Sequence, residues 1–187
     1  MELTAAVEAL AGYGRPWWIA GGWAIDLFTG AGPRHHDDVD VMVLRRDQRD
    51  LAAHLDGWDV QAVVRPGELQ PWRGEWLEHP VHEVRARRSG DDAWTFELLL
   101  DEADADRWVF RRDRRVTCPL ARLGVEREGL PVLAPEIVLL FKAKSPGPKD
   151  EADFEAALPL LRPAARAWLA QALGVSHAEH PWLQRLA

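Results

Sequence analysis

The stretch WWIAGGWAID at Trp17–Asp26, followed by RHHDDVDV at Arg34–Val41, decides the fold of this chain. Its first part is a short apolar run that meets Gly21 and Gly22 and then continues with apolar residues at helical spacing. This is the pattern of a strand, a tight turn and the first turn of a helix, where backbone N–H groups converge on an anion. The sequence therefore predicts an anion-binding turn, with close packing or a positive φ as the structural alternative for two glycines at that position.

The second part of the stretch ends in Asp38-Val39-Asp40 and enters the apolar run Val41–Leu44. Because side chains along a strand alternate with a period of two, we expect Asp38 and Asp40 on the same face. Two adjacent carboxylates repel each other unless a cation lies between them, and Mg²⁺ is the simplest oxygen-seeking candidate. Asp-x-Asp alone is common on exposed strands, but next to an anion-binding turn it indicates a site for phosphoryl or nucleotidyl transfer.

A third acid occurs inside the strand expected at Trp94–Leu100. Glu97 lies in an otherwise apolar run, and an unpaired acid is costly to bury. If this strand neighbours the strand expected at Val39–Leu44, Glu97 reaches the same metal or accepts a proton from an attacking hydroxyl. The alternative is a glutamate that faces solvent on a half-exposed strand.

The rest of the pattern predicts an α+β fold, with a mixed sheet and helices of the α/β type. Further strands are expected at 58–64 and 81–87, with hairpin turns at 89–92 and 128–129. Helices are expected near 3–10, 22–28, 47–55, 135–144, 150–161, 163–173 and 182, with Asp47 as an N-cap and Ser145–Pro148 as the strongest breaker. A soft boundary near residue 134 divides a sheet core, residues 1–134, from a C-terminal helical subdomain, residues 135–187.

Charge and composition limit the partners of the protein. The net charge of −7 argues against nucleic acid as a partner and weakly favours a cationic one. The single cysteine, Cys118, excludes an intrachain disulfide and fits a reducing compartment. The N-terminus lacks the features of a signal peptide, and no apolar run approaches the roughly 20 residues that span a bilayer. We therefore expect a soluble, cytoplasmic protein without a membrane partner.

Several cationic side chains are candidates for binding phosphate. Arg34 and His36 directly precede the expected metal strand, so they either contact phosphate, fix Asp38 or belong to a solvated loop. Lys142 lies on an expected helix and either neutralises a triphosphate or faces solvent. The basic segment Arg111–Arg115 can serve the same purpose, or it pairs with the acidic segment Asp101–Asp106.

The motifs Gly-Gly-Trp-Ala-Ile-Asp and Arg-x-His-x-Asp-x-Asp within Trp17–Val41 resemble the aminoglycoside 2''-adenylyltransferase-like branch of the nucleotidyltransferase superfamily. They are also similar to the related lincosamide nucleotidyltransferases. That superfamily is marked by a Gly-Gly or Gly-Ser turn, a following Asp-x-Asp and a third acid on a later strand, where this chain has Glu97. Segments 108–112 and 135–161 also resemble members of this branch, so the similarity extends over most of the chain.

The resemblance implies a nucleotidyltransferase core, a C-terminal helical region, and transfer of AMP from Mg-ATP to a hydroxyl group. It implies that Asp38 and Asp40 hold Mg²⁺, that Glu97 is a metal ligand, a general base or both, and that Gly21 and Gly22 cradle the outer phosphates. The expected acceptor is a small, cationic molecule such as an aminoglycoside. Two alternatives remain: an enzyme that modifies a macromolecule, as toxin–antitoxin members of the superfamily do, and a catalytically silent nucleotide-binding module.

Overall fold

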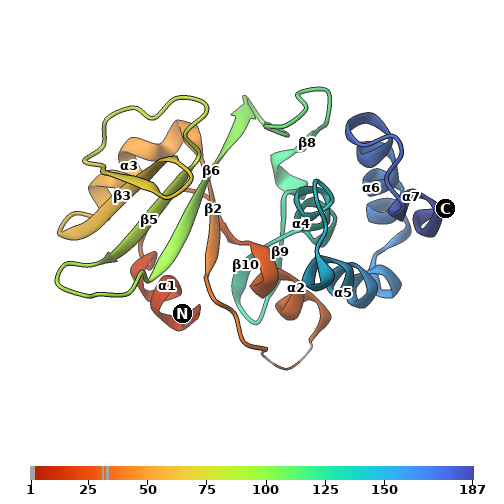
Figure 1. Ribbon diagram of the computed structural model, residues 1–187, viewed down its shortest axis with the longest axis horizontal. Coiled ribbons are helices and arrows are strands. Elements are labelled where there is room, and N and C mark those ends of the chain that lie inside the picture. Colours follow the sequence, from red (N-terminus) through yellow and green to blue (C-terminus); the bar gives the residue numbers. More distant parts are fainter. Residues whose placement is uncertain (1–2, 31, 33) are drawn as a thin grey trace.

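The computed structural model describes residues 3–30, 32 and 34–187, which form a mixed sheet with helices on both of its faces (Figure 1). The helices are α1 (Leu3–Ala9), α2 (Gly21–Thr29), α3 (Gln48–His54), α4 (Pro135–Lys142), α5 (Pro148–Ala157), α6 (Pro163–Ser176) and α7 (Trp182–Leu186). The strands are β1 (Trp17–Ile19), β2 (Asp40–Leu44), β3 (Trp58–Arg65), β4 (Glu68–Pro71), β5 (Glu83–Arg88), β6 (Phe96–Asp104), β7 (Arg107–Val109), β8 (Thr117–Pro119), β9 (Gly124–Arg127) and β10 (Leu130–Leu133). Short 3-10 helices occupy Arg45–Asp47, Leu120–Arg122 and Leu158–Leu160. The predicted α+β class with a mixed sheet is confirmed.

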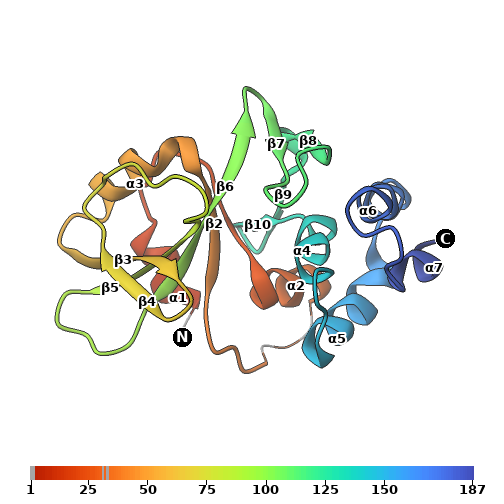
Figure 2. The same ribbon diagram turned by 45° about the horizontal axis from the view of Figure 1, so that its top comes forward.

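The strand order along the main path of the sheet is β4-β3-β5-β6-β2-β1-β10-β9. β2 is parallel to β6 and β1 is parallel to β10, whereas the other neighbours on this path are antiparallel. Beyond this path, β7 pairs with the end of β6, and β8 pairs with β7. These pieces form an arm that projects from the sheet near α6 (Figure 2). The central position of β2 places its first residue, Asp40, between the strands that carry the other predicted site residues.

The two faces of the sheet belong to two hydrophobic cores. On one face, Val41 and Val43 of β2 and Leu98 of β6 pack with residues of α1 and α3. On the other face, Met42 and Ile19 pack with residues of α2, α4 and α6. Figure 1 shows α1 and α3 at one end of the molecule and α4–α7 at the other. Because side chains alternate along β2, Asp40 shares the second face with Met42.

The expected boundary near residue 134 falls between β10 and α4. Residues from both sides of this point contribute to one buried cluster, which includes Ile19, Val132, Leu139 and Phe154. The helical region therefore packs directly on the sheet through α4, which begins at Pro135 in the position where proline is favoured in a helix.

The strand expected at Trp94–Leu100 instead spans Phe96–Asp104, so both of its predicted ends are wrong. The strand persists because its acids are satisfied: Trp108 Nε1 donates a hydrogen bond to the buried Asp101 at 2.9 Å, and Glu102 pairs with Arg45. Burial of an acid is tolerated when such partners are present.

Three short strands, β4, β7 and β8, were not predicted. All four residues of β4 are exposed, so no buried apolar alternation marks it. Asp47 is the N-cap residue of α3, as predicted, although its side chain makes no capping hydrogen bond. The hairpin of β9 and β10 is confirmed, with positive φ angles at Glu128 and Gly129 that suit a two-residue turn. Within the described part of the chain, every helix is too short or too polar to span a bilayer.

Candidate active site

The glycine turn lies directly against the first carboxylate of β2. The Ala20 N–H donates to the Asp40 carbonyl at 2.8 Å, which joins the end of β1 to the start of β2. Gly21 has φ +59°, and a Cβ atom there would lie only 2.2 Å from Asp40 Oδ2. At Gly22 a Cβ atom would lie 2.7 Å from the ring of His36. Close approach of side chains therefore requires both glycines, and the turn and Asp40 meet as predicted.

Three strands contribute to a row of charged side chains on this face. In the register of the sheet Asp40 on β2 lies opposite Glu97 on β6, and Glu97 lies opposite Arg85 on β5. The Arg85 guanidinium contacts Glu97 Oε1 at 3.0 Å and Glu83 Oε1 at 2.9 Å. Glu83 is two residues from Arg85 and therefore lies on the same face. We call Asp40, Glu97, Arg85 and Glu83 the charged row.

The sequence analysis did not single out two members of the charged row, Glu83 and Arg85. The signal was present, because these residues alternate with Val84 and Ala86, which are buried on the opposite face. Without knowledge that β5 pairs with β6, the alternation predicts a half-exposed strand but not which neighbours its charged side chains meet.

The carboxylates of the row carry more negative charge than the cations around them compensate. Burial, followed by the charges of Asp38 and Glu97, raises the pKa of Asp40 to about 7, against a smaller opposing effect of Lys142. Burial and then Glu83 raise the pKa of Glu97 to about 7, against the effect of Arg85. Asp38 is exposed and lies near both carboxylates. Such a cluster favours a bound proton or a bound cation.

The three predicted metal ligands are neighbours, but they do not form a complete metal site by themselves. In the described ranges, no group of three or more His, Cys, Asp or Glu side chains is arranged to hold a metal ion. Arg85 on β5 holds the Glu97 carboxylate, whereas Asp40 lies on β2, on the other side of β6. Metal binding by Asp38, Asp40 and Glu97 therefore stays a prediction.

The loop that carries Asp38 is anchored to α2 and α5. Asp26 of α2 contacts Arg34 Nε at 3.0 Å and His36 Nε2 at 2.7 Å. Arg34 also pairs with the buried Asp153 of α5. The His36 ring lies 4.5 Å from the Trp23 ring, measured between centroids. These contacts fix the backbone that leads into Asp38 and Asp40.

Lys142, at the end of α4, belongs to the same polar network. Its ammonium group contacts Asp150 at 2.8 Å and Asp153 at 2.9 Å. Burial opposes the charge of Lys142, but the two hydrogen bonds outweigh burial and raise its pKa. The structure thus brings Arg34, His36 and Lys142 to one side of the glycine turn, and each of them already has a carboxylate partner.

Two cavities meet at Gly21, Asp40 and Lys142 and together form a cleft. The polar cavity has a volume of about 280 Å³ and is lined by the 34–38 loop, Lys149 and Asp153. The second cavity has a volume of about 200 Å³, and its walls include Met42, Leu99, Leu133, Val138 and Phe141. Its far end is formed by Asp101, Arg111 and Arg112.

Arg111 and Arg112 are the cations of the cleft that lack a carboxylate partner. Their guanidinium groups lie 5.0 and 5.3 Å from the centre of the Phe141 ring, and Arg112 donates to the Phe141 carbonyl at 2.6 Å. Burial lowers the pKa of both, to about 10 for Arg112. Neither forms an ion pair within the described chain, but the charge of the buried Asp101, which lines the same cavity, opposes the lowering of the pKa of both, and Arg115 pairs with Asp113. Of the acidic segment, Asp101 thus interacts with the basic segment, but without an ion pair.

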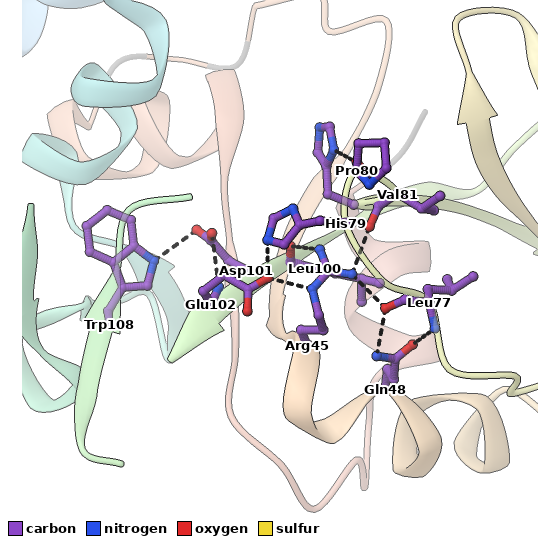
Figure 3. A network of polar contacts seen from close by, with 11 residues as sticks. Arg45, Gln48, Leu77, His79, Pro80, Val81, Leu100, Asp101, Glu102 and Trp108 are labelled. Atoms are coloured by element: carbon purple, nitrogen blue, oxygen red, sulfur yellow. Dashed lines mark hydrogen bonds and ion pairs between the residues drawn. The ribbon is translucent and has the colours of Figure 1, made fainter. Parts of the chain in front are cut away.

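A second polar network supports the strand that carries Glu83 and Arg85 (Figure 3). Arg45, which is buried, contacts Glu102 at 2.5 Å and donates to the carbonyls of Leu77 at 2.9 Å and Val81 at 2.7 Å. His79 approaches the same Glu102 carboxylate at 3.0 Å. The network attaches the segment before β5 to β6, so it fixes the position from which β5 enters the charged row.

Comparisons with known proteins agree with this geometry and define the class of the protein, which is a nucleotidyltransferase. The chain belongs to the aminoglycoside-2''-adenylyltransferase family, whose sequence model matches residues 2–136. A lincosamide resistance protein from Staphylococcus haemolyticus is 20% identical over 127 residues, which cover 67% of this chain and 72% of that protein.

Two solved structures share the fold. The lincomycin-bound lincosamide antibiotic adenylyltransferase LnuA has a TM-score of 0.57 and 13% identity, covering 85% of this chain and 96% of that one. ANT(2")-Ia in complex with adenylyl-2"-tobramycin has a TM-score of 0.57 and 20% identity, covering 91% of this chain and 94% of that one. The match to the family model confirms the predicted family and enzyme class, and the two solved structures agree with the predicted fold.

Proposed function

We propose that the protein transfers AMP from ATP, in a Mg²⁺-dependent reaction, to a hydroxyl group of a small cationic acceptor. The observation that carries this proposal is the contact between the glycine turn and the charged row. Gly21 packs against the Asp40 carboxylate, and Asp40 lies in register with Glu97. A phosphate-binding turn, a metal-binding carboxylate and a proton acceptor are thus adjacent, as transfer to a hydroxyl requires.

The donor set of the site fits Mg²⁺. Asp38 and Asp40 offer carboxylate oxygens, and the pKa of Asp40 is raised first by burial and then by neighbouring negative charge, which a cation would relieve. Mg²⁺ is commonly held by one or two carboxylates together with substrate phosphates, so a third protein ligand is not required. Bound there, the ion would neutralise phosphate charge and orient the α-phosphate.

Residues of the chain itself bind the phosphates and accept the proton. The N–H groups at the start of α2 bind phosphate oxygens, and Arg111 and Arg112 add positive charge from the other end of the cleft. Glu97 accepts the proton of the acceptor hydroxyl, for which a pKa of about 7 is well matched to neutral pH. The hydroxyl oxygen attacks the α-phosphorus, the bond from that phosphorus to the bridging oxygen breaks, and pyrophosphate leaves.

A cationic acceptor follows from the surplus of carboxylates around the place where its hydroxyl must lie. Asp38, Glu83 and Glu97 are grouped near one cation, Arg85. An amine-bearing acceptor is attracted to such a group and, once bound, lowers the repulsion among the carboxylates. The names of the relatives, which refer to lincosamides and to tobramycin, suggest antibiotics of these two kinds as first acceptors to test.

Calorimetric titration of ATP into the protein, with and without Mg²⁺, tests the donor half of the proposal. We expect binding that depends on Mg²⁺ and that weakens at least tenfold in Asp40→Asn. Asp91→Asn, which changes an exposed acid in the hairpin turn before β6, is the matched control and should bind as the wild type does.

Pyrophosphate release with tobramycin or lincomycin as acceptor tests the second half. Release that requires an acceptor and disappears in Asp40→Asn supports the proposal. Wild-type protein that binds no nucleotide, or an Asp40→Asn variant that releases pyrophosphate at the wild-type rate, contradicts it.

A further inference from the structure

A second cavity of about 330 Å³ lies away from the cleft, between the arm and α6. It is lined by residues of β7, β8 and the turn between them on one side, and by residues of α6 on the other. Figures 1 and 2 both show β8 beside α6. None of its described lining residues also lines the two cavities of the cleft, so it is a separate space.

Three arginines, Arg107, Arg115 and Arg122, line this space, which we call the arginine cavity, and Arg122 also lines a neighbouring cavity that contains Glu136. The described lining includes no Asp or Glu. Arg115 is neutralised by Asp113 at 2.6 Å and donates to the Val175 carbonyl at 2.9 Å. The arginine cavity is therefore basic in a chain whose net charge is −7.

Two of these arginines carry charge that no ion pair compensates. Arg107 donates to Thr117 Oγ1 at 2.5 Å, which orients its guanidinium group, but neither Arg107 nor Arg122 has a carboxylate within ion-pair distance in the described ranges. Burial raises the pKa of Glu136, and the charge of Arg122 opposes this rise although the two groups are beyond ion-pair distance. Glu136 therefore compensates only part of the charge of Arg122. In the polar cavity of the cleft, by contrast, Arg34 and Lys142 are both paired.

The α6 side of the arginine cavity contributes the apolar residues Trp168, Ala172 and Val175, together with the amide of Gln171, although most of the accessible surface of the cavity is polar. The Trp168 ring is held in place by Trp108, with ring centroids 6.4 Å apart. A volume of about 330 Å³ with apolar residues on one side suits a small organic molecule better than a macromolecule, which does not need a cavity.

We propose that the arginine cavity binds a small organic phosphate that carries a ring. Two uncompensated guanidinium groups match the charge of a phosphate monoester, about −1.5 to −2 at neutral pH. Arginine also recognises phosphate through paired N–H donors, and the Trp168 wall receives the ring. The site is distinct from the cleft and does not depend on the function proposed for it.

Titration of the ¹⁵N-labelled full-length protein with phenyl phosphate tests this assignment. We expect the indole N–H signal of Trp168 and the Nε–H signals of Arg107 and Arg122 to shift in a saturable way. Inorganic phosphate lacks the ring and phenol lacks the charge, so each should bind at least about tenfold more weakly. The variant Asp40→Asn, which changes the cleft and no residue that lines the arginine cavity, should leave these shifts unchanged.

The double variant Arg107→Gln/Arg122→Gln should weaken binding of phenyl phosphate at least tenfold, which corresponds to about 1.4 kcal/mol. Both arginines are exposed, so the variant should keep its fold, as its spectrum will show directly. Arg114→Gln removes an exposed charge of the same segment outside the cavity and is the matched control.

Arg107→Lys/Arg122→Lys keeps the charge without the paired donors and should bind with intermediate affinity. Equal affinity of the wild type and the double glutamine variant would overturn the proposal. So would equal affinity for phenyl phosphate and inorganic phosphate, or shifts confined to residues of the cleft.

Discussion

Replacement of Gly21 by alanine tests whether the glycine turn and Asp40 form one unit. The backbone of Gly21 has φ +59°, a region in which an L-residue costs about 1–2 kcal/mol. The new Cβ atom would also lie 2.2 Å from Asp40 Oδ2, whereas ordinary contact begins near 3.4 Å. The carboxylate must therefore move by about 1.2 Å, the difference of these two distances. Overpacking of this kind costs about a further 1–3 kcal/mol.

We therefore expect Gly21→Ala to lower the free energy of unfolding by about 2–5 kcal/mol and to lower kcat by about 100-fold. The loss of activity follows because a displacement of about 1 Å in a catalytic group has an effect of this size. Urea unfolding, with the slope m checked for constancy, measures the first quantity. Pyrophosphate release at saturating ATP measures the second.

Gly30→Ala is the matched control, because Gly30 has φ +67° and a Cβ atom there meets nothing within 4 Å. It should cost only the backbone term of about 1–2 kcal/mol and leave kcat unchanged. In an Asp40→Ala background the Oδ2 and Cγ atoms that Gly21→Ala strikes are absent and only the Cβ atom at 3.2 Å stays, so the cost should fall close to the Gly30→Ala value. Two differences therefore measure the same packing energy independently. The first is the cost of Gly21→Ala minus the cost of Gly30→Ala, and the second is the fall in the cost of Gly21→Ala when Asp40 is shortened.

Two results would refute the reasoning. The first is a stability cost for Gly21→Ala that does not exceed the cost for Gly30→Ala. The second is a cost for Gly21→Ala that stays the same when Asp40 is shortened, since this would mean that the turn and the carboxylate do not press on each other.

Three further predictions concern individual carboxylates. The folded-state pKa of Asp40, about 7, lies above the unfolded value near 3.8. Ionisation of Asp40 therefore destabilises the fold as the pH rises from about 4 through 7. Asp40→Asn should be about 1–2 kcal/mol more stable than the wild type at pH 8 but no more stable at pH 4. Urea unfolding at the two pH values measures this difference. Glu97→Gln should lower kcat at least 100-fold with less than a threefold change in ATP affinity, and the rise of kcat near pH 7 should disappear. Equal effects on kcat and on ATP affinity would make Glu97 a ligand only. Glu102→Gln leaves the buried Arg45 without its carboxylate partner, so it should lower the free energy of unfolding by about 2–3 kcal/mol. It should also speed hydrogen exchange in the segment before Glu83. An unchanged exchange rate there would show that the network does not anchor this segment.

The local features of the fold could be predicted from the sequence because each has a short-range cause. The strand, turn and helix around Gly21 follow from an apolar run interrupted by glycine, and the confirmed hairpin at Glu128-Gly129 follows from turn chemistry. Asp40 and Glu97 were predicted to lie close together if their strands are neighbours. The strands β2 and β6 do pair, and in their register the two acids lie opposite each other.

The features that were missed depend on long-range contacts. Arg85 and Glu83 join the charged row only because β5 pairs with β6, a pairing that no periodicity in β5 specifies. The extension of β6 to Asp104 depends on Trp108 and Arg45, which satisfy its acids from other parts of the chain. Likewise, Asp153 lies 119 residues from Arg34, and only the folded chain reveals that it neutralises this predicted phosphate ligand.

The distribution of paired and unpaired charges gives the cleft a direction. Arg34, His36 and Lys142 are compensated by Asp26, Asp150 and Asp153, so the polar cavity is nearly balanced. Because these cations are balanced, they contribute more to positioning the 34–38 loop than to attracting an anion.

The surroundings of Asp40 and the second cavity, by contrast, are unbalanced in opposite senses. Near Asp40, the carboxylates Asp38, Glu83 and Glu97 exceed the charge of Arg85, whereas in the second cavity Arg111 and Arg112 exceed the charge of Asp101. Under the proposed function, a cationic acceptor would be drawn to the acidic side, beside Glu97. The anionic donor would be drawn across the glycine turn toward the arginines. The reverse arrangement would place like charges together at both ends, so electrostatics favours the orientation in which the acceptor hydroxyl faces Glu97.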